Sequence, residues 1–321
     1  MIKVKNLKKA FGQKYAVNGV SFAVERGEVL GFLGPNGAGK STTMRMITGF
    51  IPPTEGTISV GGFDMVDDPI PGKRLMGYLP ENAPAYTDMT VHGFLGFAAE
   101  LRGLSGDAKK KAINGAVDMC FLDSVLHQSV DTLSKGYRHR TSLAQALLHN
   151  PDVLILDEPT DGLDPNQKHE IRTLIRRMGE SKAIIFSTHI LEEVEAVCSR
   201  AIIIDRGQIV ANGTPQELKA QSDAAGTVTV SLFDANADNV TQKLHALPAT
   251  KEARLVSDTG NRLVIRCVPN KDQANGSYSR TIAELAQREN WRLAELRTEE
   301  GRLDDVFRSI TLSETNKGAK Q

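Results

Sequence analysis

A glycine-rich segment at residues 34–42 has the composition and the setting of a phosphate-binding loop. It reads GPNGAGKST, follows the apolar run VLGFL and precedes TTMRMITGF, which has helical character. Glycines at positions 34, 37 and 39 let backbone N–H groups curl around phosphate oxygens, and a helix that begins there points its positive end at them. The alternative, a glycine-rich turn with a chance lysine, does not account for the strand and the helix on either side.

The side chains of this loop favour a nucleoside triphosphate with its magnesium ion. Lys40 supplies a positive charge for the β and γ phosphates and is expected to act in catalysis, while the Ser41 hydroxyl is placed to ligate Mg²⁺. We therefore predict that ATP and Mg²⁺ bind here. The predicted nucleotide-binding residues of the loop are Gly34, Pro35, Asn36, Gly37, Ala38, Gly39, Lys40, Ser41 and Thr42.

Two carboxylates follow the apolar run VLIL. Asp157 and Glu158 come at the end of this expected strand, where Asp157 can hold the shell of a Mg²⁺ ion and Glu158 can orient or deprotonate an attacking water. Two acidic residues in this position can instead cap the turn that follows. The phosphate-binding loop upstream favours the catalytic interpretation, which predicts hydrolysis of the bound nucleotide.

Alternating strands and helices are expected to position these groups. Short β-branched runs between glycine-rich turns predict strands over residues 1–90, and helical spacing predicts a helical insertion near 91–145. Strands are expected again at 153–158, 183–189 and 201–205. The almost wholly apolar runs among them are typical of parallel strands that are buried on both faces.

A composition shift at residues 216–226 predicts a linker, and beyond it a second domain is expected over residues 227–311. Its runs predict the order β-α-β-β-α-β, which is the ferredoxin-like pattern, and LDDVFRSI predicts one more short helix. The polar tail at 312–321 is expected to be disordered. Because this second domain has no recognisable catalytic group, we expect an accessory or regulatory role.

Composition disfavours several classes of protein. The chain has 39 Lys and Arg against 39 Asp and Glu, so no overall basic field favours nucleic acid as a partner. No apolar run reaches the length that spans a membrane. Cys120, Cys198 and Cys267 lack the spacing of metal ligands or of a disulfide framework, so the reducing cytosol is the expected compartment.

A further motif, LSKGYRHR at 133–140, ends an expected loop and opens an expected helix. With the phosphate loop, the helical insertion, LDEPT, DGLD and STH in this order, residues 1–215 resemble the nucleotide-binding domain of ABC ATPases. The resemblance implies an α/β P-loop NTPase fold, with a RecA-like core and antiparallel β and helical subdomains. It also implies a head-to-tail dimer, in which each ATP is held by one subunit's phosphate loop and by Ser134 and Gly136 of the other.

The resemblance assigns three further residues. It places Phe11 against the adenine ring, although a Phe near an N-terminal strand is otherwise more often a core residue. It places Asp164 in the loop that crosses the dimer interface, where an ordinary Asp-Pro turn is the alternative. It matches His189 to the histidine that contacts the γ-phosphate, whereas a lone histidine at a strand end is usually structural.

Three positions depart from the common family pattern. The signature LSGGQ is here LSKGY, so that Lys135 replaces a glycine and Tyr137 replaces a glutamine. Glu81 stands where most members carry a glutamine near Mg²⁺ and water, and we expect it to be a metal ligand. LSKGYR, YLPE and the LDDVF-type ending resemble the subset that serves ABC-2 type exporters, including the gliding-motility-associated ATPases.

The sequence thus predicts the ATP-hydrolysing subunit of an ABC transporter, which dimerises with itself or with a similar ATPase and drives membrane-spanning permease subunits. Its expected location is the cytoplasmic face of the inner (plasma) membrane, through those subunits. Tyr86, Phe94 and Phe97 are candidates for the groove that receives a permease helix, with core packing as the alternative. A soluble ABC ATPase that acts as an assembly or regulatory switch is the other functional class. The absence of a long coiled coil and of a basic segment weakens it.

Overall fold

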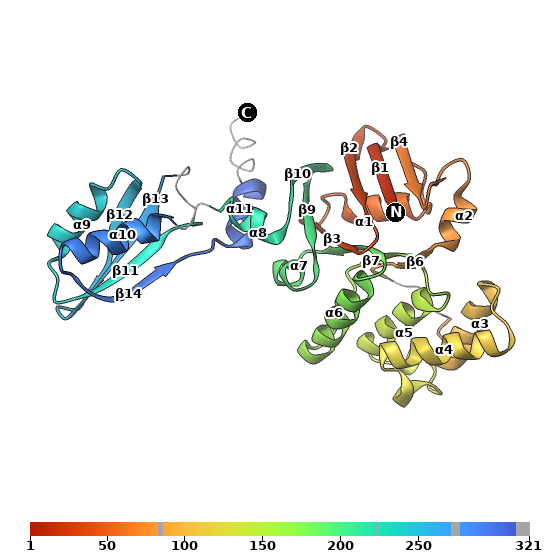
Figure 1. Ribbon diagram of the computed structural model, residues 1–321. Helices are drawn as coiled ribbons and strands as arrows, with labels where there is room; N and C mark the ends of the chain where they lie inside the picture. Colours follow the sequence, from red (N-terminus) through yellow and green to blue (C-terminus); the bar gives the residue numbers. More distant parts are fainter. Residues whose placement is uncertain (83–85, 223, 271–276, 313–321) are drawn as a thin grey trace. The chain divides into compact units, whose positions relative to one another are not determined.

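The chain divides into two units, Met1–Pro215 and Gln216–Gln321, in the computed structural model (Figure 1). The structure describes residues 1–82, 86–222, 224–270 and 277–312. The tail that is expected to be disordered, 312–321, therefore lies outside the described residues, except for residue 312 at the end of a helix. Among the described helices, none is long and apolar enough to cross a membrane.

Six strands form the central sheet of the first unit. They are β3 (Glu28–Leu33), β6 (Met76–Leu79), β7 (Val153–Asp157), β8 (Ala183–Thr188), β9 (Arg200–Asp205) and β10 (Gln208–Gly213). They lie in the order β10-β9-β3-β8-β7-β6, and the neighbours from β9 to β6 pair in parallel. The expected strands at 153–158, 183–189 and 201–205 are confirmed. Because every residue of β7 and β8 is buried, both faces of this sheet are covered, as expected for parallel strands.

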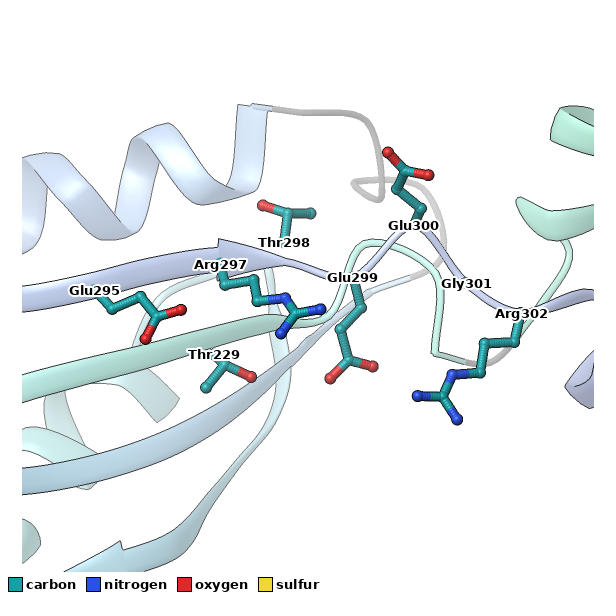
Figure 2. A pocket seen from close by; sticks show the side chains of 8 residues that line it. All are labelled: Thr229, Glu295, Arg297, Thr298, Glu299, Glu300, Gly301 and Arg302. Carbon is teal, nitrogen blue, oxygen red and sulfur yellow. The ribbon is translucent and has the colours of Figure 1, made fainter.

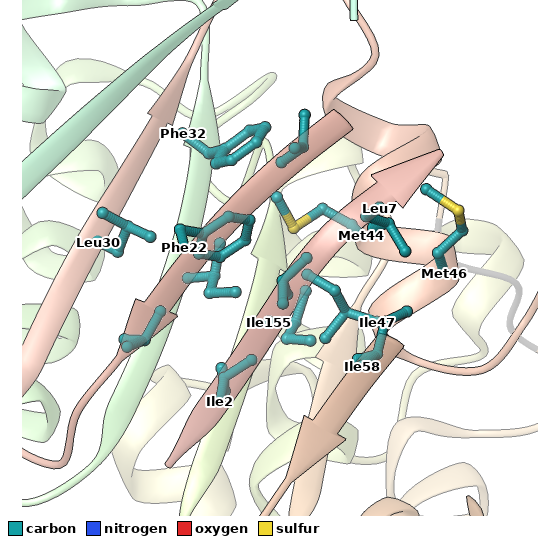
Figure 3. Close-up of a cluster of buried hydrophobic side chains, with 14 of the residues drawn as sticks. Ile2, Leu7, Phe22, Leu30, Phe32, Met44, Met46, Ile47, Ile58 and Ile155 are labelled. Carbon is teal, nitrogen blue, oxygen red and sulfur yellow. The ribbon is translucent and has the colours of Figure 1, made fainter. Parts of the chain in front are cut away.

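A second, antiparallel sheet packs on the same apolar core as the helix that follows the phosphate loop. Its strands are β1 (Ile2–Phe11), β2 (Lys14–Val24), β4 (Glu55–Val60) and β5 (Phe63–Asp64), in the order β2-β1-β4-β5. Met44 and Ile47 of α1 (Lys40–Ile47) share the core with Ile58 of β4 and Ile155 of β7 (Figure 3). Burial of this helix fixes the direction in which its N-terminus points.

The expected helical insertion is confirmed as α3 (Val91–Leu101), α4 (Gly106–Cys120) and α5 (Lys135–Leu147), which contact one another (Figure 1). Phe94 packs in the core of this group, as the core alternative predicts. Tyr86 is exposed, with its ring centroid 5.3 Å from that of Phe97. In the described part of the first unit, the remaining α-helices are α2 (Pro69–Arg74), α6 (Pro165–Gly179) and α7 (Leu191–Val197), and two short 3-10 helices lie at Asp123–Val125 and Val130–Thr132.

The second unit contains a four-stranded sheet with two helices on one face. Its elements follow one another as β11 (Val228–Phe233), α9 (Ala237–His245), β12 (Thr250–Asp258), β13 (Arg262–Pro269), α10 (Ser277–Arg288) and β14 (Arg292–Thr298). The sheet order is β12-β13-β11-β14, and every pair is antiparallel. Side chains of α9 and α10, among them Leu244 and Ile282, share one apolar cluster with β11 and β13.

Two further helices belong to this unit, α8 (Pro215–Lys219) and α11 (Leu303–Leu312). α8 lies at the start of the segment 216–226, for which the sequence predicts a linker, and its Leu218 is fully buried. Ser222 Oγ donates to Asp305 of α11 at 3.3 Å. The first half of the expected linker is therefore a folded part of the second unit.

All three cysteines of the chain are buried and none forms a disulfide. Burial raises the pKa of the Cys120 and Cys267 thiols to about 12, and it also raises the pKa of the Cys198 thiol. A Cβ added at Gly31 would lie 2.8 Å from Cys198 Sγ, so this thiol fills the space over β3. All three cysteines therefore act as packing residues.

Candidate functional site

A polar pocket of about 360 Å³ lies where β3, β7 and β8 end. Neighbouring parallel strands finish at one edge of a sheet, so the segments after these three strands converge although they are far apart in the sequence. No sequence pattern points to Ala16, and Asp161, the first residue of the DGLD motif, is not among the predicted site residues, yet both belong to the pocket. The lining residues are Ala16, Pro35, Asn36, Gly37, Gly39, Lys40, Ser41, Thr42, Glu81, Glu158, Asp161 and His189.

The phosphate loop is built so that only glycine fits at its tightest points. A Cβ at Gly34 would lie 2.4 Å from the carbonyl oxygen of Ile204, and a Cβ at Gly39 would lie 2.5 Å from that of Ala16. Gly39 also has a φ of 108°, which L side chains rarely adopt. As the N-cap of α1 it supplies no side-chain hydrogen bond, so the first N–H groups of the helix have no side-chain cap. This geometry fits a phosphate group at the N-terminus of α1.

Lys40 is held inside the loop. Its side chain is 6% exposed, and Nζ donates to the carbonyl oxygen of Gly34 at 2.7 Å. Burial lowers the pKa of this ammonium, while the carboxylates of Glu158, Asp157 and Glu81 raise it. The positive charge therefore stands within a loop that can wrap an anion, as the sequence predicts.

Glu158 and His189 form a hydrogen-bonded pair at one side of the pocket. Nδ1 of His189 lies 3.0 Å from each carboxylate oxygen of Glu158. Glu158 has a φ of 52°, a left-handed conformation that costs a non-glycine residue roughly 1 kcal/mol or more and that functional sites often contain. Burial raises the pKa of Glu158, and His189 and Lys40 partly oppose this rise. A carboxylate with a raised pKa is a stronger base, which suits proton abstraction from water.

The three predicted metal ligands are placed differently. Ser41 and Glu81 line the pocket, whereas Asp157 does not. Asp157 is 1% exposed and accepts a hydrogen bond from the Ser187 hydroxyl of β8. Within the described part of the chain, no group of three or more His, Cys, Asp and Glu side chains is arranged to hold a metal ion. The hydroxyl and carboxylate oxygens at the pocket are the donor types that Mg²⁺ prefers, so the residues fit that ion together with phosphate oxygens.

A buried glutamate, Glu193, forms hydrogen bonds with the segments that carry Glu158 and His189. No sequence pattern predicts this glutamate. Glu193 of α7 is fully buried and accepts hydrogen bonds from Thr160 Oγ1 at 2.5 Å and from Thr188 Oγ1 at 2.8 Å. Arg172 of α6 donates to the same carboxylate at 3.2 Å. Thr160 follows Glu158 by two residues and Thr188 precedes His189, so this network holds both arms of the pair.

Gly34 and Ala38 of the phosphate loop do not line this pocket, and three predicted nucleotide-binding residues from other segments also lie outside it. Ser134 is the N-cap of α5 and accepts a hydrogen bond from the N–H of Tyr137 at 3.4 Å. A Cβ at Gly136 would lie 2.7 Å from Gln167 Oε1, so glycine allows α5 to approach α6 closely. Phe11 is 57% exposed, which shows that the alternative of core packing is wrong. None of the three belongs to the phosphate pocket of their own chain.

Asp164 also has a local role. It is the N-cap of α6, and its Oδ1 accepts a hydrogen bond from the N–H of Gln167 at 2.9 Å. The turn-forming alternative for this residue therefore describes its contacts within the chain. Its expected place at a dimer interface stays a prediction.

A second hollow, of about 600 Å³, lies in the second unit at the end of β14 (Figure 2). It is open and lined by charged and polar side chains, and it contains none of the predicted site residues. The residues that line it are Thr229, Glu295, Arg297, Thr298, Glu299, Glu300, Gly301 and Arg302.

Together, the phosphate loop at the start of α1, the lysine inside it and the carboxylates at the ends of neighbouring parallel strands define a P-loop nucleotide hydrolase. Comparison with known proteins agrees with this class. The family described as ABC transporter matches residues 17–161. Linearmycin resistance ATP-binding protein LnrL of Bacillus subtilis is 39% identical over 220 residues, which are 68% of this chain and 70% of that protein. Nod factor export ATP-binding protein I of Burkholderia lata is 38% identical over 226 residues, which are 68% of this chain and 72% of that protein.

Solved structures of ABC transporter ATP-binding proteins are also similar to this chain. A structure described as the ATP binding subunit of an ABC transporter has a TM-score of 0.64 and 32% sequence identity, over 69% of this chain and 92% of the other. The dimeric structure of MJ0796, a bacterial ABC transporter cassette, has a TM-score of 0.63 over 67% of this chain and 99% of the other, and at 24% identity it shows a shared fold. The chain belongs to the ABC transporter family of ATP-binding proteins, and its activity is ATP hydrolysis.

Proposed function

We propose that this chain is the motor of an ABC-2 type exporter, of the kind that includes the gliding-motility-associated ATPases. The observation that carries the proposal is the convergence of the phosphate loop with the Glu158–His189 pair in one pocket. Export is supported by relatives that are named for linearmycin resistance and for Nod factor export. LSKGYR, YLPE and the LDDVF-type ending support the ABC-2 subset.

Each group in the pocket has a role in hydrolysis. Lys40 and the backbone N–H groups at the start of α1 bind the phosphates of ATP. Ser41, Glu81 and Asp157 would hold Mg²⁺, which would supply positive charge to neutralise the β and γ phosphates. Glu158 accepts a proton from the attacking water. His189 orients this carboxylate through its hydrogen bond and contacts the γ-phosphate.

We also infer that the working form is a dimer, of two copies or of this chain with a similar ATPase. Ser134 and Gly136 then face the ATP bound by the partner subunit, and Phe11 stacks on adenine. The inference is supported by the dimeric structure that shares this fold and by the position of Ser134 at a helix N-terminus outside its own pocket. ATP closes such a dimer and hydrolysis reopens it, which shifts the conformation of attached permease subunits.

For the second unit we propose a ferredoxin-like accessory domain over residues 227–311 that supports subunit association. Its element order and its own apolar cluster support this. A chain that ends at Thr214, before α8, tests it, since a later end would leave Leu218 without its packing. We expect ATP binding to be kept and dimerisation to weaken. Loss of ATP binding in a folded truncated chain would contradict the proposal.

Membrane purification with a tagged chain tests the transport function. We expect the chain to be recovered from the cytoplasmic face of the plasma membrane with a subunit that spans the membrane several times. Lys40→Ala should abolish ATP binding, whereas Lys3→Ala, which changes an exposed lysine at the start of β1, should leave it unchanged. Recovery only from the soluble fraction, with ATPase activity intact, would favour the alternative of an assembly or regulatory switch.

A further inference from the structure

The signature segment reaches the phosphate pocket of its own chain through Lys135, the first residue of α5. Nζ of Lys135 donates to Asp161 Oδ2 at 2.7 Å, and Asp161 lines the pocket together with Lys40. The aliphatic stem of Lys135 lies across Gly162, where a Cβ would come within 2.5 Å of its Cδ. An ion pair and a stem contact therefore join the start of α5 to the turn that follows β7.

Because charged side chains line the pocket, this ion pair bears on how strongly the pocket binds an anion. Three carboxylates, those of Glu81, Glu158 and Asp161, line it beside the ammonium of Lys40. ATP adds negative charges, and an unpaired carboxylate about 4 Å from one of them weakens ATP binding by a factor of roughly five in a water-like dielectric. The hydrogen bond from Lys135 is the main cause of the lowered pKa of Asp161. Protonation therefore does not relieve this repulsion at neutral pH.

Folding stability does not explain the pair. The side chains of Lys135 and Asp161 are 67% and 46% exposed, and exposed pairs of this kind contribute little to the free energy of unfolding. Its position at the pocket is what distinguishes it from other surface pairs. Lys110 and Asp107 on α4, for example, form an exposed pair at 3.9 Å that has no contact with the pocket.

We propose that Lys135 is a positioning residue for nucleotide binding in its own subunit, because it holds the Asp161 carboxylate and removes its repulsion of the ATP phosphates. The inference rests on the proposed function of the pocket. Ser134 and Gly136, on either side of Lys135, are proposed to face the ATP of the partner subunit. The pair thus links the segment that serves one nucleotide to the pocket that holds the other.

Calorimetric titration of the full chain with ATP and Mg²⁺ tests this. Lys135→Met keeps the stem over Gly162 and removes the charge, and we expect it to weaken ATP binding by about fivefold. The loss should shrink at high salt, because screening reduces the repulsion of Asp161. Asp161→Asn should bind at least as tightly as the wild type. The double variant should regain wild-type affinity, since the carboxylate that Lys135 neutralises is gone.

Lys110→Met is the matched control, because it breaks an exposed pair away from the pocket, and it should leave ATP binding unchanged. Two results would overturn the proposal: wild-type affinity in Lys135→Met, or a double variant that binds as weakly as Lys135→Met alone. Failure of the wild type itself to bind ATP would instead refute the proposed function of the pocket. The three outcomes are therefore distinguishable.

Discussion

His189 Nδ1 lies 3.0 Å from both carboxylate oxygens of Glu158, although 31 residues separate the two in the sequence. They meet because β7 and β8 are parallel neighbours in the sheet and each residue directly follows the end of its strand. The left-handed backbone at Glu158 turns its side chain at that point. The pair therefore depends on the register of two buried strands, and its geometry suits the roles proposed for Glu158 as a base and for His189 as the group that orients it.

Glu158→Gln should preserve ATP binding and lower the rate of hydrolysis about a hundredfold or more, because an amide cannot take a proton from water. The ATP-bound dimer should then accumulate, which size-exclusion chromatography with and without ATP measures. Glu180→Gln, an exposed residue after α6, is the control and should hydrolyse ATP normally. A near wild-type rate in Glu158→Gln would exclude this residue as the base and leave Glu81 as the leading candidate.

His189→Ala should shift the pH dependence of hydrolysis as well as reduce its rate. The hydrogen bond and the charge of His189 lower the pKa of Glu158, whereas burial raises it. Without His189 the pKa of Glu158 rises further, so the active carboxylate form is lost at a higher pH as the solution is acidified. The acid limb of kcat/KM should therefore move toward neutral pH. An unchanged acid limb would show that another group controls it, and His245→Ala in the second unit serves as the control.

Glu193→Ala should reduce kcat at least about tenfold with a smaller effect on ATP affinity, because Thr160 and Thr188 lose the acceptor that holds both arms of the Glu158–His189 pair. It should also lower the free energy of unfolding by about 1 to 3 kcal/mol, since buried hydroxyls lose their partner. Glu192→Ala, on the exposed side of α7, should change neither. Loss of stability with unchanged kcat would mean that Glu193 is purely structural.

His149 should make the protein less stable in mild acid. Burial lowers its pKa to about 4 from the ordinary value of 6.5, and Nε2 lies 3.1 Å from the carbonyl oxygen of Met76. Below the ordinary pKa the unfolded chain takes up a proton that the folded chain does not, so stability falls as pH falls from about 6.5 to about 4, by up to about 3 kcal/mol. Urea denaturation over this range should show a shallower fall in His149→Gln. An identical slope would contradict this account.

Much of the fold could be predicted because its strands are apolar runs beside glycine-rich turns. β3, β7, β8 and β9 follow that pattern. β6 lies within residues 1–90, where strands are predicted, but no run of its own marks it, and no pattern predicts β10. β6 is only four residues long and contains Gly77, and β10 is a partly exposed edge strand without an apolar run. Such strands are specified by their neighbours in the sheet more than by their own residues.

The residues of the site also divide into those that the sequence predicts and those that it does not. Motif spacing predicts the loop around Lys40 and the pair of acids at the end of β7, because these residues are close in the sequence or follow apolar strands. The role of Glu193 and the contact between Asp161 of the DGLD motif and Lys135 could not be predicted, since helix packing and a turn bring these partners together. The local signal at Glu193 is that of an ordinary helix. Lys135 is visible as an unusual residue, but its partner is not.

The burial of every native thiol makes this chain a convenient background for spectroscopy. Cys120, Cys198 and Cys267 are enclosed, and the raised pKa of each keeps it protonated, so maleimide reagents have no reactive thiolate to attack in the folded protein. A cysteine introduced at an exposed position such as Lys110 would then carry the label alone. Fluorophores or spin labels attached there would report the approach of two subunits during each cycle without any prior removal of natural cysteines.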